Sequence, residues 1–374
     1  MKICMDYQPA VAQCAGIGRY TRVLASELAK IIDADDKLKL FYCDFKRSAD
    51  ISLLPSRAEV KAFRMLPGAI MQKMWHYLRF PPFNTLAGDA DIFHFTNFTT
   101  KPVTRGRSVV SIHDMSFVRF PQFAEERNLR YLTKGIRYTV RDADAIITIS
   151  EFSKSEIEEL LPESRGKVFV THLGISNDFQ HSSQDDIAAV REELGLPRPF
   201  IMTLGTVEPR KNLEFLVDVF ESIAGEGIDL VVAGAPGWKS EAIMERFKKT
   251  PFAEQLHYLR FVPDGKLAAL YSAASIFVLP SHYEGFGFTP VEAMACGTPV
   301  ITSNCGSIPE IVGDGAKVIE SFDVAEWKSE ILNLISDNEQ REKMSKLGLK
   351  RAEKFRWDIT ARKTLEIYKK VLEK

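Results

Sequence analysis

The feature that most constrains this chain is a repeated alternation of short apolar runs with longer amphipathic stretches, sustained from one end to the other. Apolar runs without polar alternation are typical of strands buried on both faces of a parallel sheet. The stretches between them, such as 20–32 and 128–143, repeat apolar residues at helical spacing. Strands and helices that alternate in this way predict an α/β fold with parallel, doubly wound sheets.

The predicted strands form two series, separated by a polar segment. The first series is 2–6, 38–44, 91–95, 108–114, 145–150 and 168–174, and the second is 200–205, 229–234, 257–262, 275–281, 299–304 and 316–320. The polar segment 176–198 lies between them, and 374 residues suffice for two hydrophobic cores. We therefore expect two Rossmann-like domains that face a central cleft, over 1–185 and 198–356. The helix predicted over 357–374 follows the natural end of the second domain, which leaves it able to pack back on the first.

Charge and cysteine content narrow the functional classes. The chain has 49 Lys+Arg and 50 Asp+Glu, whereas nucleic-acid-binding proteins are usually far more basic. An odd number of cysteines without a C-x-x-C pair argues against a disulfide framework or a zinc ribbon and indicates a reducing compartment. These cysteines are Cys4, Cys14, Cys43, Cys296 and Cys305. Because neither a signal peptide nor a membrane-spanning apolar run is recognisable, we expect a cytoplasmic protein, soluble or attached peripherally to the inner face of the membrane.

The most informative loop follows the strand predicted at 275–281. It contains Gly285 and Gly287, and the sequence then places Thr289 and Pro290 as the N-cap and first residue of a helix. A glycine-rich backbone can approach an anion closely, and the free N–H groups at a helix start can hold that anion. The segment therefore predicts an anion-binding loop.

Two glutamates, Glu284 and Glu292, lie on either side of this loop, eight positions apart. Taken singly, each has a simpler interpretation. Glu284 could be a solvated loop carboxylate, and Glu292 a first-turn acid that complements the helix dipole. Within a strand–loop–helix segment that also carries two glycines, we expect both to contact one ligand from different sides.

A second loop, LGTVEPRKNL at 204–213, combines a glycine with two cations. The predicted strand ends at Gly205, and Arg210 and Lys211 lie where the next helix is expected to begin. A surface Arg-Lys pair is usually only solvated. Beside the free N–H groups of a helix start, however, this pair predicts a clamp for a diphosphate.

Near the N-terminus, Gly16, Gly18 and Arg19 follow the first strand and precede a helix. The G-x-G-x-x-T pattern approaches the dinucleotide-binding fingerprint, which requires a third small residue and an acidic residue about 20 positions further on. Thr21 occupies the third place, and Asp44, at the end of the second predicted strand, lies too far along the chain to be the acidic residue. The glycines alone are therefore weak support for a nicotinamide cofactor.

His113 and Asp114 end the strand predicted at 108–114, where residues of a parallel sheet face the ligand side. A lone histidine is as often structural as functional. The triplets D-A-D at 89–91 and 142–144 resemble metal-binding motifs, but both precede apolar strands. We interpret them as polar strand starts and predict no metal site.

Residues 57–141 carry fourteen Lys/Arg and six Asp/Glu in a chain that is otherwise near neutral. Within this region, 61–83 interleaves cations with Met, Trp, Tyr and Phe, a composition typical of an interfacial helix or of a site for a lipid-diphosphate sugar. A helix with its apolar side in the core and its cations in solvent would have the same composition. The segment thus predicts a peripheral membrane contact without excluding a structural role.

Taken together, these motifs resemble the retaining GT-B glycosyltransferases of family 4. Glu284-x7-Glu292 within EGFGFTPVEAMACGTPVI resembles the family signature, LGTVEPRKNL its phosphate-binding loop, and RFVPDGKLAALYSAASIFVLPS its base-binding segment. AGIGRY, SIHD and ITISEFSK fit the same family, so the resemblance covers nearly the whole chain. PRKN, EGFGFTPVEA and IHD are most similar to the bacterial mannosyltransferase branch.

The resemblance implies roles for the residues of the glycine loop. Glu292 would hydrogen-bond the ribose hydroxyls of the donor, and Glu284 would contact the transferred sugar. The backbone amides of Phe286, Gly287 and Phe288 would bind the sugar and the diphosphate. All five would therefore belong to the donor site.

The resemblance also implies how the base and the diphosphate are bound. Backbone around Phe261 and Val262 would meet the nucleobase. In many relatives an arginine follows the glycine of the phosphate-binding loop, whereas this chain has Thr206. Arg210 and Lys211 must then supply the positive charge.

In the first domain, the resemblance places Gly16, Gly18 and Arg19 beside the donor diphosphate. His113 would orient the transferred sugar through its backbone or side chain. Asp114 would orient the imidazole or meet the acceptor.

The sequence thus predicts a retaining hexosyltransferase whose donor is a nucleotide-diphosphate sugar, with GDP-mannose favoured and other GDP- and UDP-sugars left open. The acceptor would be a glycan or lipid-linked glycan in bacterial polysaccharide or lipopolysaccharide synthesis. No cofactor is expected, because two cations and helix N–H groups already face the diphosphate. The alternatives are a nucleotide-sugar epimerase or a phosphorylase of the same fold, a nicotinamide-dependent oxidoreductase and a sugar-nucleotide-binding protein without turnover.

Overall fold

The computed structural model describes residues 1–13, 16–50 and 54–373. Cys14 and the first residue of AGIGRY, Ala15, lie outside the described residues. The chain divides into two compact units: unit 1 comprises Met1–Gly174 with Arg356–Lys374, and unit 2 comprises Ile175–Phe355. The first segment of unit 1 therefore ends at Gly174, whereas the composition suggested residue 185.

Unit 1 is built on a parallel sheet of seven strands within the described residues. The strands are β1 (Lys2–Asp6), β2 (Lys37–Cys43), β3 (Ala58–Phe63), β4 (Ile92–Phe95), β5 (Arg107–Ser111), β6 (Ala145–Thr148) and β7 (Val168–Val170). Their order is β3-β2-β1-β4-β5-β6-β7, so the chain starts in the middle of the sheet and winds first to one edge and then to the other. This is the doubly wound arrangement expected from the apolar runs.

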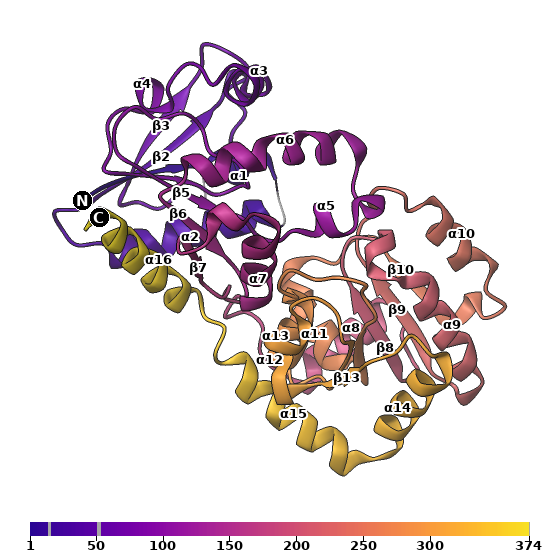
Figure 1. The fold of residues 1–374 in the computed structure, drawn as a ribbon. Helices are drawn as coiled ribbons and strands as arrows, with labels where there is room; N and C mark the ends of the chain where they lie inside the picture. Colours follow the sequence, from indigo (N-terminus) through magenta and orange to yellow (C-terminus); the bar gives the residue numbers. More distant parts are fainter. Residues whose placement is uncertain (14–15, 51–53, 374) are drawn as a thin grey trace. The chain divides into compact units, whose positions relative to one another are not determined.

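Helices cover both faces of this sheet (Figure 1). They are α1 (Gln8–Ala12), α2 (Ile17–Ile31), α3 (Gly68–Lys73), the π-helix η1 (Met74–Leu78), α4 (Phe83–Ala87), α5 (Ser116–Arg119), η2 (Pro121–Phe123), α6 (Glu126–Asp142), α7 (Glu151–Leu160), η3 (Pro162–Ser164) and α16 (Trp357–Leu372). One core lies between the strands and α3, η1, α4, α6 and α7, where Trp75, Phe83 and Ile136 are buried. The opposite face carries α2 and α16.

The C-terminal helix α16 packs along α2 within unit 1. Tyr368 places its hydroxyl 2.6 Å from Nδ1 of the buried His94, and Nε2 of that histidine lies 2.8 Å from Ser111 Oγ. At the start of the helix, Thr360 Oγ1 donates to the carbonyl of His172 over 2.7 Å. These hydrogen bonds tie the end of the chain to the first sheet.

Unit 2 holds a parallel sheet of six strands among its described residues, all of them expected from the sequence. The strands are β8 (Phe200–Leu204), β9 (Asp229–Ala233), β10 (Leu256–Leu259), β11 (Ile276–Leu279), β12 (Val300–Ser303) and β13 (Lys317–Ile319). Their order, β10-β9-β8-β11-β12-β13, is that of a Rossmann fold. The carboxyl ends of the adjacent strands β8 and β11 are where such a sheet binds its ligand.

The helices of unit 2 alternate with these strands. They are α8 (Gln184–Glu193), η4 (Pro209–Lys211), α9 (Leu213–Ile223), η5 (Ala224–Glu226), α10 (Glu241–Lys249), η6 (Ala253–Gln255), α11 (Asp264–Ala273), α12 (Phe288–Ala295), α13 (Ile308–Val312), η7 (Gly313–Gly315), α14 (Val324–Ser336) and α15 (Asn338–Ala352). A core of α9, α10 and α14 against the strands buries Phe220 and Trp327. Because Ser182 N donates to Ser272 Oγ and α8 packs on α11, the residues from 175 onward belong to unit 2.

The prediction of two parallel α/β domains is confirmed, except that one edge strand was not predicted. The strand β3 was missed, because it is an edge strand whose residues Glu59, Val60 and Lys61 are exposed and which therefore lacks an apolar run. In the part of the chain that the structure describes, no helix combines the length and apolar character needed to cross a bilayer.

Candidate donor site and basic surface

Two loops of unit 2 meet at the carboxyl ends of β8 and β11, which pair in the sheet. The backbone N–H of His282 donates to the carbonyl of Arg210 over 2.8 Å and joins the two loops. Arg210 and Lys211 come from the loop after β8, and Ser281 and Glu284 from the loop after β11. The fold thus brings together residues that lie more than seventy positions apart in the sequence.

These side chains form a cluster of ion pairs around Glu284. Lys211 Nζ lies 2.6 Å from Glu284 Oε1, and Arg210 Nη1 lies 2.9 Å from Oε2. Ser281 Oγ donates to Oε1 over 2.7 Å, and Arg210 Nη1 also donates to the carbonyl of Tyr283 over 2.6 Å. The predicted cations and the predicted carboxylate therefore contact one another directly.

The cluster determines the ionisation of Glu284, whose side chain is only 9% exposed. Burial by itself would raise the pKa of this carboxyl. The charges of Arg210 and Lys211, with hydrogen bonds from Lys211 and Ser281, outweigh burial and lower the pKa to about 2. Glu284 is therefore a carboxylate at neutral pH, suited to accept hydrogen bonds and not to act as a general acid.

The structure adds a residue that the sequence analysis did not single out. Glu208 is 2% exposed, and its Oε1 accepts a hydrogen bond of 2.6 Å from Arg210 Nη2. Its second oxygen, Oε2, is buried without a hydrogen-bond partner among the described residues. The only signal in the sequence was its position directly before Pro209, Arg210 and Lys211.

The local backbone explains how the two cations are placed. Pro209–Lys211 forms the short helix η4, and Asn212, with φ +55°, separates it from α9. Arg210 and Lys211 therefore lie in the first helical turn after β8, as expected, and the longer helix α9 (Leu213–Ile223) follows it. Gly205 has φ +149°, and a Cβ there would lie 3.2 Å from Cε of Lys211, so glycine leaves room for the lysine chain.

The glycine loop also begins its helix differently from the prediction. Helix α12 starts at Phe288, and Gly287, with φ +90°, is its N-cap residue in place of Thr289. A Cβ on Gly287 would lie 2.6 Å from Cδ1 of Ile308, so only glycine fits. Because the helix starts earlier, Glu292 lies beyond its first turn, and the dipole interpretation of this residue loses its basis.

Glu292 is 3% exposed and accepts a hydrogen bond of 3.1 Å from the hydroxyl of Tyr271. Its place on α12 keeps it in unit 2 with Glu284. Phe286 is buried, and its ring packs edge-on against Phe288 at 5.3 Å between ring centroids. The aromatic pair fixes the loop that precedes α12.

Phe261 and Val262, predicted to meet the base, and Thr206, which stands where many relatives have arginine, belong to the same unit. Phe261, in the loop between β10 and α11, is 78% exposed, whereas its neighbour Val262 is buried. Thr206 is exposed at the end of β8. The position of Phe261 leaves its ring and backbone accessible to a ligand.

In unit 1, the imidazole of His113 is buried, and Nε2 lies 3.0 Å from the carbonyl of Thr96. Tyr20 packs edge-on against its ring at 4.9 Å, and burial lowers the pKa of His113. Asp114 Oδ1 accepts hydrogen bonds from N and Oγ of Ser116, at 3.0 and 2.7 Å. Thr96 therefore orients the imidazole, and Asp114 instead caps the start of α5.

The glycine motif of unit 1 lies at the start of α2. Gly16 is the N-cap residue of this helix, and Gly18 packs against the carbonyl of Gln13. Arg19 lies in its first turn and is partly exposed. Thr21, in the third place of the motif, is buried and donates to the carbonyl of Ile17 over 2.9 Å. The motif therefore forms a tight turn into α2.

The last aspartate of each D-A-D triplet directly precedes a strand, as predicted, and accepts a hydrogen bond from the backbone of a neighbouring strand. Lys2 N donates to Asp91 Oδ2 over 2.7 Å, and Ser108 N donates to Asp144 Oδ2 over 2.8 Å. Over 1–13, 16–50 and 54–373, no group of three or more His, Cys, Asp or Glu side chains could hold a metal ion. The triplets thus serve the sheet.

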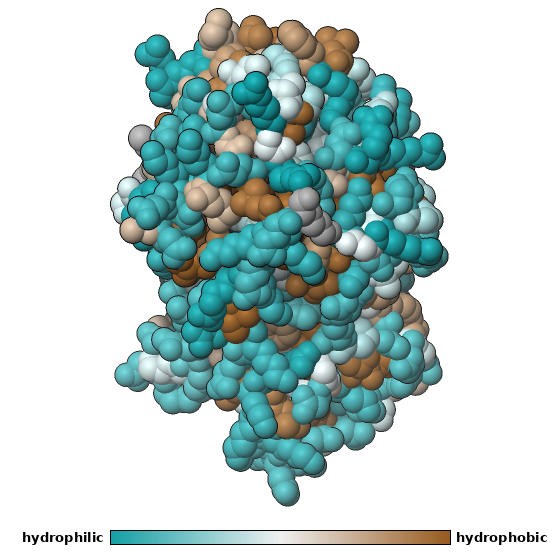
Figure 2. Space-filling view, turned by 60° about the vertical axis from the view of Figure 1, so that its left-hand side comes forward, coloured by the Kyte–Doolittle hydropathy of each residue, from teal (hydrophilic) through white to brown (hydrophobic). Residues whose placement is uncertain are grey.

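The segment 61–83 is not one helix but the end of β3, then α3 and η1. Trp75 faces the core and donates from Nε1 to the carbonyl of Pro81 over 2.9 Å. The large apolar side chains that are exposed here are Met65, Leu66, Ile70, Tyr77, Leu78 and Phe80. Figure 2 shows apolar side chains gathered at the top of the view, the end where Figure 1 places α3. The segment therefore serves the core and also presents an apolar surface.

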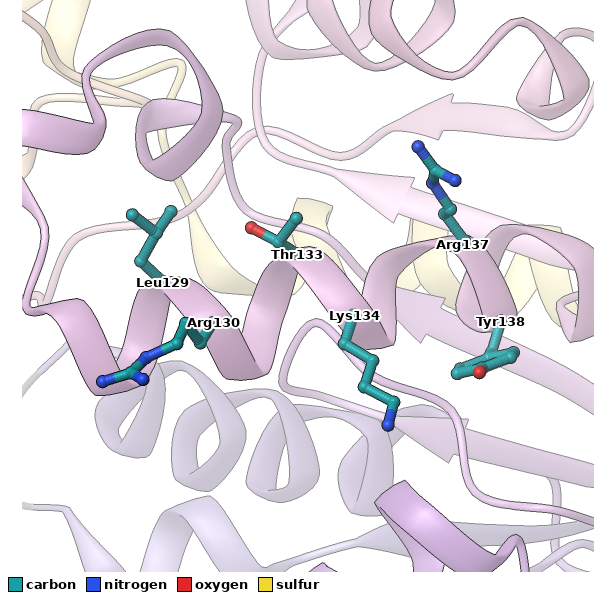
Figure 3. Close-up of a pocket in the computed structure, with 6 residues that line it drawn as sticks. All are labelled: Leu129, Arg130, Thr133, Lys134, Arg137 and Tyr138. Atoms are coloured by element: carbon teal, nitrogen blue, oxygen red, sulfur yellow. The ribbon is translucent and has the colours of Figure 1, made fainter.

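Helix α6 continues this surface with cations. Its exposed basic residues are Arg127, Arg130, Lys134, Arg137 and Arg141. Lys134 lies 4.6 Å from the ring centre of Tyr77, which joins α6 to η1. Figure 3 shows Leu129, Thr133 and Arg137 on one side of α6 and Arg130, Lys134 and Tyr138 on the other, and together they line an open depression of about 530 Å³. This depression belongs to unit 1.

Two family models match consecutive parts of the chain. Glycosyltransferase Family 4 matches residues 15–179, and Glycosyl transferases group 1 matches residues 186–351. The second match contains the whole cation–carboxylate cluster.

The chain is also similar to proteins of known activity. O-antigen chain mannosyltransferase B of Escherichia coli is 30% identical over 391 residues, which cover 99% of this chain and 100% of that protein. The serotype-specific mannosyltransferase WbdA of Escherichia coli is 29% identical over 238 residues, which cover 62% of this chain and 29% of that longer protein.

Solved structures with the same fold include two with full coverage. Sucrose-phosphate synthase from Thermosynechococcus elongatus superposes with a TM-score of 0.78 at 20% identity and covers 100% of this chain and 99% of that one. WaaG, a glycosyltransferase involved in lipopolysaccharide biosynthesis, superposes with a TM-score of 0.74 at 15% identity, covering 98% of this chain and 99% of the other. At these identities the likeness establishes the fold.

Proposed function

The chain belongs to the family 4 glycosyltransferases of GT-B fold, and from this premise we propose that it transfers mannose from GDP-mannose to a glycan or lipid-linked glycan acceptor, with retention of anomeric configuration. Its full-length similarity to an O-antigen chain mannosyltransferase supports mannose as the sugar and surface polysaccharide or lipopolysaccharide as the product. The donor sugar, the stereochemistry and the acceptor are the parts of this proposal that require experiment.

The observation that carries the proposal is the cluster of Arg210, Lys211 and Glu284 at the carboxyl ends of β8 and β11. Two cations held in place before a ligand arrives stabilise a diphosphate leaving group at no cost in reorganisation. The carboxylate between them would accept hydrogen bonds from the hydroxyls of the transferred sugar. The site thus offers what departure of a nucleoside diphosphate from a sugar requires.

The proposal also gives roles to the other predicted site residues. The exposed loop at Phe261 would meet the base, and Glu292 the ribose hydroxyls. The N–H groups at the start of α12 would add to the charge offered by Arg210 and Lys211. In unit 1, the loops at Gly16–Arg19 and at His113 would serve the donor sugar and the acceptor.

We also propose that the reaction needs no cofactor and no metal ion, with the nucleotide sugar as a substrate. Arg210 and Lys211 would take the part that a divalent cation plays at other diphosphates. Turnover should therefore be unchanged by EDTA, and loss of turnover that Mg²⁺ or Mn²⁺ restores would refute this part of the proposal.

The donor can be identified by thermal shift with GDP, UDP, dTDP, ADP and NAD, each with its sugar conjugates where they exist. We expect GDP and GDP-mannose to raise the melting temperature of the wild type but not that of Lys211→Ala. Lys248→Ala is the matched control, because Lys248 is an exposed lysine of α10 in the same unit. Stabilisation by UDP would reassign the donor, and stabilisation by NAD alone would favour the oxidoreductase.

Turnover and stereochemistry need a second experiment. Incubation with GDP-mannose and an acceptor glycan should give a product whose new linkage has the anomeric configuration of the donor, as read by NMR. Glu284→Ala should retain GDP binding and lose transfer. A product of inverted configuration would exclude retention, and conversion of the donor sugar to its epimer without transfer would favour the epimerase.

We propose further that unit 1 contacts the anionic inner face of a membrane through 61–83 and α6. Residues 60–88 contain no Asp or Glu, and the exposed apolar side chains of this segment lie beside the cations of α6. Apolar side chains inserted below the headgroups, with cations at the headgroup level, are the combination that binds anionic bilayers. A lipid-linked acceptor would then reach the enzyme in the plane of the membrane.

Flotation with phosphatidylcholine vesicles, with and without phosphatidylglycerol, tests this contact. The wild type should float only with phosphatidylglycerol, and Leu78→Glu should remain in the soluble fraction because a carboxylate replaces a side chain that is 68% exposed. Leu349→Glu, an exposed leucine of α15 in unit 2, is the matched control and should float like the wild type. Equal flotation of Leu78→Glu and wild type, or none for either protein, would overturn the proposal.

A further inference from the structure

Glu208 has contacts that a purely structural ion pair would not explain. Its side chain is buried, one oxygen accepts from Arg210 Nη2 at 2.6 Å, and the other has no hydrogen-bond partner in the described parts of the chain. A buried carboxylate oxygen without a donor is costly, and replacing both partners of such a pair by apolar residues is often neutral or stabilising. The arrangement therefore indicates a function connected with Arg210.

The charges of the cluster balance before any ligand binds. Arg210 and Lys211 carry two positive charges, and Glu208 and Glu284 carry two negative ones in ion pairs with them. A nucleoside diphosphate thus approaches two cations whose charge is already offset. Such a site binds the anion more weakly than the cations alone would, and it releases the anion correspondingly more easily.

Glu208 also fixes the direction of the guanidinium. Arg210 Nη2 is held by Glu208, and Arg210 Nη1 by Glu284 and by the carbonyl of Tyr283. If a diphosphate takes over the contacts of Glu284, the contact with Glu208 is the side-chain ion pair that still holds Arg210. The guanidinium then keeps its orientation toward the leaving group.

We propose that Glu208 is a positioning residue that acts through Arg210: it keeps the guanidinium aimed at the leaving diphosphate, and its charge lets the nucleoside diphosphate leave after transfer. The inference rests on the proposed function, because it assumes that the cluster binds a nucleoside diphosphate. It assigns no contact between Glu208 and the substrate. It does assign opposite effects on binding and on turnover, which a structural role would not produce.

Three variants, studied by calorimetric titration with GDP and by steady-state kinetics, test the inference. Glu208→Gln removes the charge and keeps an acceptor, so GDP should bind roughly tenfold more tightly while kcat falls. Glu208→Asp keeps the charge, so GDP affinity should remain near that of the wild type, with kcat reduced because the shorter chain withdraws from Arg210. Glu214→Gln is the control for charge, because Glu214 is an exposed carboxylate of α9 in the same unit.

The outcomes separate this inference from the proposed function. If the wild type binds neither GDP nor UDP, the proposed function fails. If the wild type binds GDP and a folded Glu208→Gln binds it equally or more weakly, the role of Glu208 is refuted while the proposed function stands. If Glu208→Gln fails to fold, the comparison passes to Glu208→Asp, where weaker GDP binding in parallel with lower kcat would indicate a structural role and overturn the inference.

Discussion

Two buried lysine–carboxylate pairs, one in each unit, invite comparison. In unit 1, Lys101 pairs with Asp6 at the end of β1, and in unit 2, Lys211 pairs with Glu284 after β11. The side chains are 9% and 8% exposed in the first pair and 12% and 9% exposed in the second. By residue type and burial alone, the two pairs are nearly equivalent.

Their surroundings differ. The ammonium of Lys101 lies 4.9 Å from the ring centre of Trp75, 5.1 Å from that of Phe83 and 5.5 Å from that of Phe95. Aromatic side chains thus enclose the first pair. Lys211 instead shares its carboxylate with Arg210, and the loops of β8 and β11 surround both.

The comparison shows that burial of charge does not by itself mark a ligand site. The ammonium of Lys101 makes cation–π contacts with three rings of the core, and these contacts stabilise the fold. In unit 2, two cations of one loop share the carboxylate of the neighbouring loop, and preorganised cations of this kind are what a leaving group requires. The first pair should therefore govern stability, and the second activity.

The largest effect is expected for Lys101→Ala. Removing the lysine leaves Asp6 as a buried, unpaired carboxylate, which should cost about 3–5 kcal/mol of unfolding free energy. Urea denaturation followed by circular dichroism measures this loss, and the protein that remains folded should transfer sugar at the wild-type rate. A folded, fully stable Lys101→Ala with impaired transfer would reverse the assignment of the two pairs.

Lys211→Ala should show the opposite profile. Removing one preorganised cation should lower kcat about 10²–10³-fold. Stability should change less than in Lys101→Ala, because Arg210 and Ser281 still contact Glu284. Steady-state kinetics with GDP-mannose measure the change in kcat, and urea denaturation of the same preparation measures the change in stability. A loss of stability as large as that of Lys101→Ala would remove the distinction between the pairs.

Much of the fold follows from local sequence. Buried parallel strands are continuous apolar runs, so twelve of the thirteen strands found among the described residues were recognisable, and the helix predicted over 128–143 is α6. The strand β3 was not recognisable, because Glu59 and Lys61 are polar and exposed at the edge of the sheet. Its position depends on pairing with β2, which is a property of the fold and not of the segment.

The site was predictable in its residues but not in its contacts. Arg210, Lys211 and Glu284 stand in loops after strands, where a parallel α/β sheet binds ligands. That they pair with one another depends on β8 lying next to β11, although β9 and β10 come between them in the chain. Glu208 was not predicted for the same reason, because its ion pair with Arg210 and the missing hydrogen bond at its Oε2 follow from the three-dimensional structure alone.

Asp114 shows the limit of a resemblance. The resemblance implied that Asp114 orients the imidazole of His113 or meets the acceptor, and in the structure its Oδ1 accepts hydrogen bonds from Ser116 at the start of α5. An aspartate two residues before a helix finds free N–H groups close by, and these local donors compete successfully with a more distant side chain. Adjacency in sequence therefore did not predict the hydrogen bond.

The smallest of the three expected effects is the pH dependence that the unit 2 pair gives to stability. Because the cluster lowers the pKa of Glu284 from 4.5 to about 2, the folded state binds this proton less readily than the unfolded state. The stabilisation is thus complete above about pH 4.5 and is lost as pH falls toward 2. At roughly 1.4 kcal/mol per pKa unit, the stabilisation is on the order of 3 kcal/mol.

Comparison of the wild type with Glu284→Gln isolates this contribution, because the variant keeps the shape of the side chain and cannot ionise. Urea midpoints measured from pH 6 to pH 3 should show the largest advantage of the wild type at pH 6 and a steady narrowing below pH 4.5. An advantage that stays constant over this range would mean that Arg210 and Lys211 do not hold the carboxylate ionised. The contrast between the two pairs would then rest on activity alone.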